Sequence, residues 1–169
     1  KWITNEYSKK ITHLLRSKND CIISTSKSIN IDNSILNCRI EGLNKYKPDL
    51  FIIDLNMRLR RNLILNKITK KRKTILITLR ENKKKTYFFK KKGYKILLIK
   101  SLDNKNDFLL MFRRIYQLGY SKVFFETGLT FLNSLIKYKL LNNLYLFQNK
   151  KKIGKNGFNN NHINYLKKM

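Results

Sequence analysis

Short apolar runs recur along the chain and alternate with segments in which the apolar residues follow a helical period. The runs are rich in Ile, Leu and Phe and are bounded by polar or turn residues, which is typical of buried strands. They predict strands at 20–25, 49–55, 73–79, 93–100, 122–126 and 143–148.

Three segments have helical spacing. Residues 6–17 form the first, with Thr4 as the expected N-cap and with four apolar residues on one face: Tyr7, Ile11, Leu14 and Leu15. Residues 103–120 predict a second helix that begins at Asp103 or Asn104 and ends at a C-terminal glycine, Gly119. Its expected inward residues are Phe108, Leu109, Phe112, Ile115, Tyr116 and Leu118. Residues 129–140 predict the third helix, whereas the polar stretch 26–39 predicts a loop.

Strands that alternate with helices indicate an α/β fold with a central, mostly parallel sheet flanked by helices. A length of 169 residues fits one domain with its own hydrophobic core. No internal repeat is recognisable, and the Asn- and Lys-rich tail from Lys150 is expected to be loop-like. We therefore expect a single domain over residues 1–169.

The formal net charge is +28, from 38 basic and 10 acidic residues. Such a charge is typical of nucleic-acid-binding proteins, but the composition offers a second explanation. Alanine is absent and proline occurs once, whereas Lys, Asn and Ile are abundant, which is the bias that A- and T-rich codons produce. The basic residues are also spread over the whole chain, with dense runs at 70–73, 83–85 and 90–92. We therefore prefer solvated charge to a nucleic-acid-binding surface.

No apolar run approaches the roughly 18–20 residues of a membrane-spanning helix, and the first residues lack the apolar segment of a signal peptide. Cys21 and Cys38 have no motif spacing, so reduced thiols are expected. These features predict a cytoplasmic protein without a membrane partner.

Several enzyme classes lack their motifs in this chain. There is no G-x-G-x-x-G after a strand, no phosphate-binding P-loop, no G-x-S-x-G and no zinc-deaminase signature. His13 and His162 have no metal-ligand spacing, so we expect both to be surface or packing residues and predict no metal site. No nucleophile–base pair is recognisable either, and we predict no catalytic side chain.

The segment FFETGLTFLNSLI, residues 124–136, places a carboxylate where a predicted strand passes into a predicted helix. Glu126 ends the strand and Gly128 begins the helix, whose first N–H groups and dipole favour an anion. Arg16 and Arg39 each follow an apolar stretch and could hold a phosphate with two nitrogens. Each signal is weak alone, because strand-end acids, turn glycines and surface arginines are common.

The order of several segments is more specific. KWIT, LLRS, DCIISTSKSINIDNSILNCR, KPDLFIIDL, VFFETGLTFLNSLI and LNNLYLFQNKKKIG together resemble the reductase domain of the bifunctional riboflavin-biosynthesis deaminase–reductase. The resemblance covers Lys1 to about Gly154 and implies a dihydrofolate-reductase-like fold. It further implies NADPH-dependent reduction of 5-amino-6-(5-phosphoribosylamino)uracil to 5-amino-6-(5-phosphoribitylamino)uracil, with hydride passing from nicotinamide to the ribosyl C1 atom. The family is usually dimeric, so a homodimer is expected.

The same resemblance implies roles for individual residues. The family's substrate-binding positions are matched by Arg16, Leu36, Arg39 and Glu126. Its cofactor-binding positions are matched by Trp2, Ser28, Asp32, Gly128, Leu129, Thr130, Phe131, Leu132, Asn133 and Ser134. The implied substrate is a small phosphoribosylamino-pyrimidine, and no specific nucleic-acid partner is implied.

The chain also departs from the family pattern. The family's D-D-P turn reads Asp32-Asn33-Ser34, Leu55 stands where a cofactor-contacting serine is common, and Leu129 replaces a proline. The family's first strand, with its S-L-D-G-like segment, is expected to be missing from these residues, as is the deaminase half. The last strand is not recognisable beyond Gly157. A basic nucleic-acid-binding module and a catalytically decayed reductase relative stay open as alternative functions.

Overall fold

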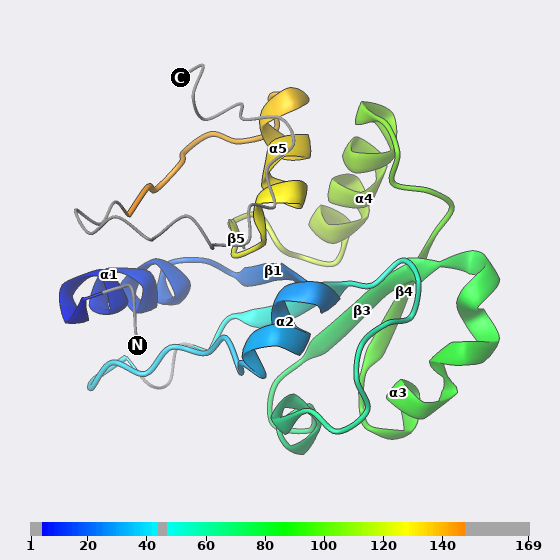
Figure 1. Ribbon diagram of the computed structural model, residues 1–169, viewed down its shortest axis with the longest axis horizontal. Helices are drawn as coiled ribbons and strands as arrows, with labels where there is room; N and C mark the ends of the chain where they lie inside the picture. The colour runs from blue at the N-terminus through cyan, green and yellow to red at the C-terminus, as the bar shows by residue number, and fades with distance from the viewer. Residues whose placement is uncertain (1–4, 44–46, 148–169) are drawn as a thin grey trace, which may run out of the picture.

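Five parallel strands form the centre of the computed structural model, which describes residues 5–43 and 47–147 (Figure 1). The strands are β1 (Cys21–Thr25), β2 (Asp49–Ile53), β3 (Thr74–Leu79), β4 (Lys95–Ile99) and β5 (Val123–Phe125). Their spatial order is β4-β3-β2-β1-β5, with Cys21 opposite Asp49 on one side and opposite Val123 on the other. The predicted α/β architecture with a parallel sheet is confirmed.

Helices cover both faces of the sheet, so the central strands β1, β2 and β3 are mostly apolar and buried without alternation. On one face, α4 (Lys105–Gln117) and α5 (Leu129–Lys137) pack on the side chains of Ile23, Phe51 and Ile77. On the other face, α2 (Ser26–Asp32), the 3-10 helix η1 (Ile64–Lys67) and α3 (Tyr87–Lys91) pack on Ile22 and Leu50. A second 3-10 helix, η2 (Arg80–Thr86), precedes α3.

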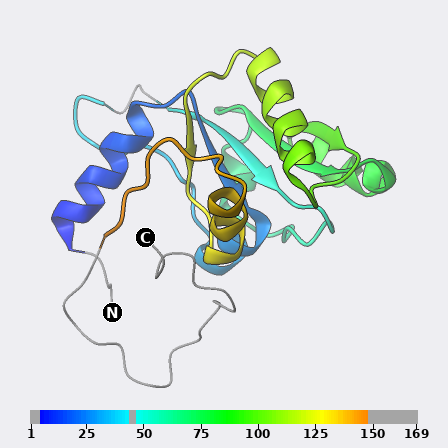
Figure 2. The ribbon, with the colours of Figure 1, turned by 90° about the horizontal axis from the view of Figure 1, so that it is seen from above.

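The first helix, α1 (Glu6–Ser17), lies beside the β1 and β5 end of the sheet (Figure 2). Its N-cap is Asn5, whose side chain accepts the Ser8 N–H at 2.8 Å, so the predicted cap at Thr4 is wrong. Tyr7 was expected on the apolar face but is exposed. No helix in the described ranges is both long and apolar enough to cross a membrane.

Two predicted elements are wrong. The expected loop at 26–39 begins with helix α2, which buries Ile29 and ends where Asn33 takes a left-handed conformation. The expected strand at 143–148 is absent from residues 143–147, which are exposed and have no strand partner, while Gln148 lies outside the described residues. An extended segment without a hydrogen-bonded neighbour is not a strand.

The inward face of α4 also differs from the prediction. Phe108, Met111 and Ile115 are buried, as the i, i+3, i+7 spacing of an amphipathic helix requires. Leu109, Tyr116 and Leu118 were expected inward but are exposed. The N-cap is Asn104, one of the two predicted residues, and Gly119 has φ of 94°, as expected of a glycine after a helix.

Candidate functional site

The order in which strands are added to the sheet reverses at β1, because β2 lies on one side of β1 and β5 lies on the other. After β1 the sheet grows through β2, β3 and β4, and the chain then returns to place β5 on the free side of β1. The helix after β1 covers one face of the sheet and the helix after β5 covers the other. In open α/β sheets, the crevice at the carboxyl ends of two such strands is the usual ligand-binding position.

Two helix N-termini meet at this crevice. Thr25 caps α2, and its hydroxyl oxygen accepts the Ser28 N–H at 3.3 Å. Gly128 begins α5 without any side-chain cap. A Cβ added at Gly128 would lie 3.7 Å from the Ser28 hydroxyl oxygen, so the two helix starts adjoin. The first N–H groups of α5 therefore face a polar opening suited to an anion.

Glu126 follows β5 and forms an ion pair with Arg16 from the end of α1. The Arg16 Nε atom donates to Oε2 at 2.9 Å and Nη2 donates to Oε1 at 2.6 Å. The Arg16 side chain is 10% exposed and the Glu126 side chain 30%. This bidentate pair joins residues 110 positions apart in the chain and leaves the Glu126 side chain partly exposed.

The loop after α2 joins the same cluster. Arg16 also donates from Nη1 to the Asn37 carbonyl at 2.9 Å, and the Arg39 N–H donates to the His13 Nδ1 atom at 3.2 Å. Leu36 is buried although its φ is +53°, a conformation that is rare for a large side chain. Burial and the neighbouring Arg16 and Arg39 lower the pKa of His13 from its ordinary value of 6.5.

Buried polar contacts hold the crevice in shape. The Ser24 hydroxyl donates to the Glu126 carbonyl at 2.7 Å and ties the end of β5 to β1. Asp54, at the end of β2, accepts the Ser26 hydroxyl at 2.8 Å and the N–H groups of Arg58 and Leu59. The starts of both helices are therefore fixed to the sheet.

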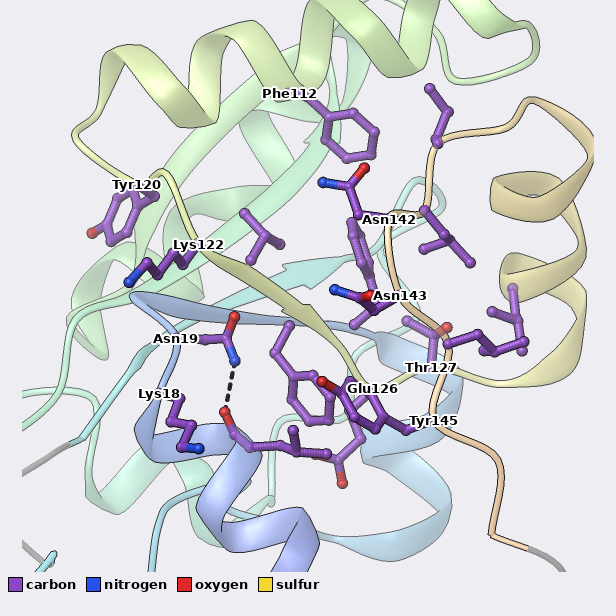
Figure 3. A pocket seen from close by; sticks show the side chains of 18 of the residues that line it. Lys18, Asn19, Phe112, Tyr120, Lys122, Glu126, Thr127, Asn142, Asn143 and Tyr145 are labelled. Atoms are coloured by element: carbon purple, nitrogen blue, oxygen red, sulfur yellow. Dashed lines mark hydrogen bonds between the residues drawn. The ribbon is translucent and has the colours of Figure 1, made fainter.

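A cavity of about 840 Å³ runs along the outer edge of β5 (Figure 3). Its lining includes α1, α4 and the segment after α5. Glu126, Thr127 and Tyr145 lie at one end of the cavity, and Tyr120 and Lys122 lie at the other. Glu126 thus lines this cavity and lies two residues before Gly128 at the start of α5.

Four of the predicted site residues come together: Arg16 and Glu126 as an ion pair, and Ser28 and Gly128 as neighbours. Leu36 and Arg39 lie on the loop beside Arg16, and the Arg39 side chain makes no hydrogen bond or ion pair within the described residues. The sequence predicted that the Arg16 guanidinium could bind a phosphate. In the structure its nitrogens instead donate to the Glu126 carboxylate and the Asn37 carbonyl.

The remaining predicted cofactor residues are spread over α2 and α5. Asp32 is exposed at the last position of α2, and Leu129 and Thr130 are exposed in the first turn of α5. Phe131 points into the core, 5.6 Å from the Phe108 ring, so only its backbone could face a ligand. Leu132, Asn133 and Ser134 follow on the same helix, and Trp2 lies outside the described residues.

Sequence reasoning missed His13 and Asn37. A signal for His13 was present, because it precedes Arg16 by three residues and therefore shares its face of α1. Asn37 acts through its backbone carbonyl, for which the sequence contains no signal.

Comparisons with known proteins agree on one family. The family model described as "RibD C-terminal domain" matches residues 1–159. The riboflavin biosynthesis protein RibD of Aquifex aeolicus (strain VF5) is 27% identical over 148 residues, which cover 87% of this chain and 39% of that protein. The chain therefore spans well under half of this relative's length.

Two solved structures show the same fold. The structure of Acinetobacter baumannii RibD, form 2, superposes with a TM-score of 0.64 at 18% identity, covering 83% of this chain and 38% of that one. The riboflavin biosynthesis reductase Rib7 of Saccharomyces cerevisiae gives a TM-score of 0.60 at 20% identity, covering 78% of this chain and 58% of that one. The expected dihydrofolate-reductase-like fold is confirmed by these neighbours.

Proposed function

The chain belongs to the RibD C-terminal domain family, and from this premise we propose that it reduces 5-amino-6-(5-phosphoribosylamino)uracil to 5-amino-6-(5-phosphoribitylamino)uracil with NADPH. The observation that carries the proposal is the meeting of two features at one crevice. The open start of α5 adjoins Ser28, and the Arg16–Glu126 pair stands beside it. A cofactor phosphate suits the first feature and a polar substrate suits the second.

The cofactor side fits a dinucleotide phosphate. Gly128 carries no side chain over the first turn of α5, and the Ser28 hydroxyl lies next to it. The backbone N–H groups of Leu129 and Thr130 can donate to phosphate oxygens, with the helix dipole favouring the negative charge. NADPH, when bound, supplies the hydride that the ribosyl C1 atom receives.

The substrate side offers an acceptor and a cation. The Glu126 carboxylate, held by Arg16, can accept N–H groups of the aminouracil ring on its open side. The exposed guanidinium of Arg39 suits the substrate phosphate, because it has five N–H donors and no partner within the described residues. The protein's contribution is then orientation and electrostatic stabilisation, without a covalent intermediate.

The test is NADPH oxidation by the purified chain, followed by the loss of nicotinamide absorbance, with the phosphoribosylaminouracil as substrate. We expect oxidation that depends on both enzyme and substrate, and formation of the ribityl product by mass spectrometry. NADPH binding without product formation would instead support the decayed-reductase alternative. Failure to bind NADPH would remove the proposal altogether.

A further inference from the structure

His13 lies at the centre of the substrate half of the site but was expected to be only a surface or packing residue. It projects from α1, is half-buried, and stands near Arg16 of the same helix and Arg39 of the loop after α2. Its Nδ1 atom is 3.2 Å from the Arg39 backbone nitrogen, 3.1 Å from the Asn37 carbonyl oxygen and 3.4 Å from Arg16 Nη1.

Counting donors and acceptors decides which ring nitrogen carries the proton. The Asn37 carbonyl already accepts a hydrogen bond from Arg16 Nη1 at 2.9 Å. The Arg39 N–H has the His13 ring nitrogen as its acceptor. Two donors therefore face Nδ1, the Arg39 N–H and Arg16 Nη1, against one acceptor, the Asn37 carbonyl. An unprotonated Nδ1 suits the two donors, which favours a proton on Nε2.

We propose that His13 is a positioning residue of the substrate site: its neutral ring accepts the Arg39 N–H at Nδ1 and so fixes the loop that carries Leu36 and Arg39 against the Arg16–Glu126 pair. The role rests on the proposed function, since it concerns that same site.

The loop needs such an anchor because its backbone is strained. Leu36 holds φ of +53°, which costs free energy for a large side chain and persists only where the surroundings fix it. One residue beyond it, the Asn37 carbonyl is held by Arg16, and two residues later the Arg39 N–H is held by His13. Arg39 can point its guanidinium at a phosphate only while this backbone is fixed.

The charges around the ring favour the neutral form. Arg16 on α1 and Arg39 on the loop are cations, and Glu126, after β5, is the one acid that acts on the ring electrostatically within the described residues. Burial and the two arginines lower the pKa of His13. The acceptor is therefore present at neutral pH and is lost as the pH falls through this lowered pKa, below 6.5.

The experiment compares His13→Leu, which removes the acceptor, with His13→Asn, which places an oxygen near the Nδ1 position. Three readouts are taken: KM and kcat for the phosphoribosylaminouracil, the NADPH dissociation constant, and hydrogen exchange of the Arg39 amide. We expect His13→Leu to raise KM about 3- to 10-fold, the loss typical of one neutral hydrogen bond, and to speed Arg39 amide exchange. The kcat value and NADPH affinity should change less than about twofold, and His13→Asn should restore most of the loss.

The pH profile separates positioning from simple packing. In the wild type, KM should rise as the pH falls below 6.5, and this rise at acidic pH should be absent in His13→Asn. Nitrogen NMR of the wild-type ring should show the proton on Nε2. A proton on Nδ1, or an unchanged KM and Arg39 exchange in His13→Leu, would overturn the proposal. If the wild type reduces no aminouracil, the proposed function fails, while the NMR and exchange readouts still decide the His13 contact.

Discussion

At the scale of single residues, the site is built from groups that hold one another. Glu126 looked from the sequence like a free acceptor, but Arg16 takes both of its oxygens. The pair is therefore preformed, and under the proposed function a substrate would meet an oriented carboxylate with its countercharge in place. Among the predicted site residues that the structure describes, Arg39 and the backbone after Gly128 have open donors, and they give the sharpest predictions.

Arg39→Ala should weaken substrate binding more than cofactor binding. The side chain is exposed and suits the substrate phosphate, and one charge-assisted hydrogen bond is worth roughly 1.5–3 kcal/mol, or about 10- to 150-fold in kcat/KM. Most of the loss should appear in KM, because the phosphate lies away from the reacting carbon. Steady-state kinetics and NADPH titration measure both effects.

The control variant is Arg113→Ala, which removes the same charge from an exposed position on α4. It should change neither kcat/KM nor NADPH affinity. An equal loss of kcat/KM in the two variants would show that the effect comes from net charge and not from a phosphate contact of Arg39.

Gly128→Ala should leave the fold intact and weaken NADPH. The φ of Gly128 is −72° and the new methyl group would make an ordinary 3.7 Å contact with Ser28, so nothing within the described chain requires glycine there. The stability in urea should change by less than about 1 kcal/mol, because the smaller chain entropy of alanine in the unfolded state favours the variant while glycine is preferred to alanine at an N-cap. The NADPH dissociation constant should rise about tenfold or more, because the methyl group stands over the phosphate-binding N–H groups.

Gly119→Ala is the contrasting variant: its φ of 94° predicts lost stability with unchanged NADPH affinity. Unchanged NADPH affinity in Gly128→Ala would remove α5 from the cofactor site.

At the scale of elements, short capping contacts fix where the strands begin. Asp20 precedes β1, and its Oδ2 atom accepts the N–H groups of Ser121 and Lys122 at 2.8 and 2.7 Å, just before β5. This contact aligns β1 and β5, whose far ends form the crevice. The Lys122 N–H is the main cause of a lowered pKa of Asp20.

The Asp20 contact predicts a specific pH dependence of stability. A lowered folded pKa means that the carboxylate stabilises the fold above its ordinary pKa of 3.8 and that this stability is lost as the pH falls through the folded value. Asp20→Asn should therefore lower the urea midpoint near neutral pH and converge with the wild type in strong acid. Asp103→Asn alters an exposed carboxylate that makes no such contact within the described residues, and it should leave the urea midpoint near neutral pH unchanged. A difference in urea midpoint between Asp20→Asn and the wild type that stays the same at every pH would contradict this prediction.

The elements that the sequence predicted well are those with long apolar patterns. All five strands of the sheet were predicted because each contains a continuous apolar run, which is buried in β1, β2 and β3 and partly buried in the edge strands β4 and β5. Helix α2 was missed because it is short and polar, and Ile29 is its one buried apolar residue. The predicted strand at 143–148 failed for the opposite reason, since its apolar pattern has no neighbouring strand in the described residues.

Within the site, the sequence predicted positions but not pairings. Among the site residues that the family motif predicted, Arg16 and Glu126 form an ion pair. Ser28 and Gly128 are neighbours, because the carboxyl ends of adjacent parallel strands converge. The binding roles of these four residues stay predictions. That Arg16 binds Glu126, and that the Asn37 carbonyl supports Arg16, depends on backbone geometry in the loop around Leu36. A left-handed leucine leaves no mark in the sequence, so these contacts could not be predicted.

At the scale of the whole molecule, the net charge of +28 has two different consequences. It produces a positive field that speeds the arrival of anionic ligands, which would include the proposed NADPH and phosphorylated substrate, and salt weakens this effect. The field alone does not make a nucleic-acid-binding site, which also needs groups arranged to contact bases. Exposed tyrosines are the natural stacking groups, and the described residues expose four: Tyr7 on α1, Tyr87 on α3, Tyr116 on α4 and Tyr145 after α5. Helices α3 and α4 cover opposite faces of the sheet, so the Tyr87 and Tyr116 rings form no common platform. Tyr116 and Tyr145 instead line the cavity along β5.

We therefore predict RNA binding that is weak, salt-dependent and indifferent to sequence. Fluorescence anisotropy with labelled poly-A, poly-U and mixed-sequence oligonucleotides should give similar dissociation constants that rise steeply and in parallel with salt, because the attraction comes from released counterions. Base stacking would add roughly 1–3 kcal/mol for each aromatic contact and would separate the three oligonucleotides. Alanine substitution of Tyr7, Tyr87 or Tyr116 should accordingly leave each dissociation constant unchanged. A tight complex with one sequence at physiological salt, weakened by one of these substitutions, would instead favour the nucleic-acid-binding alternative over the reductase.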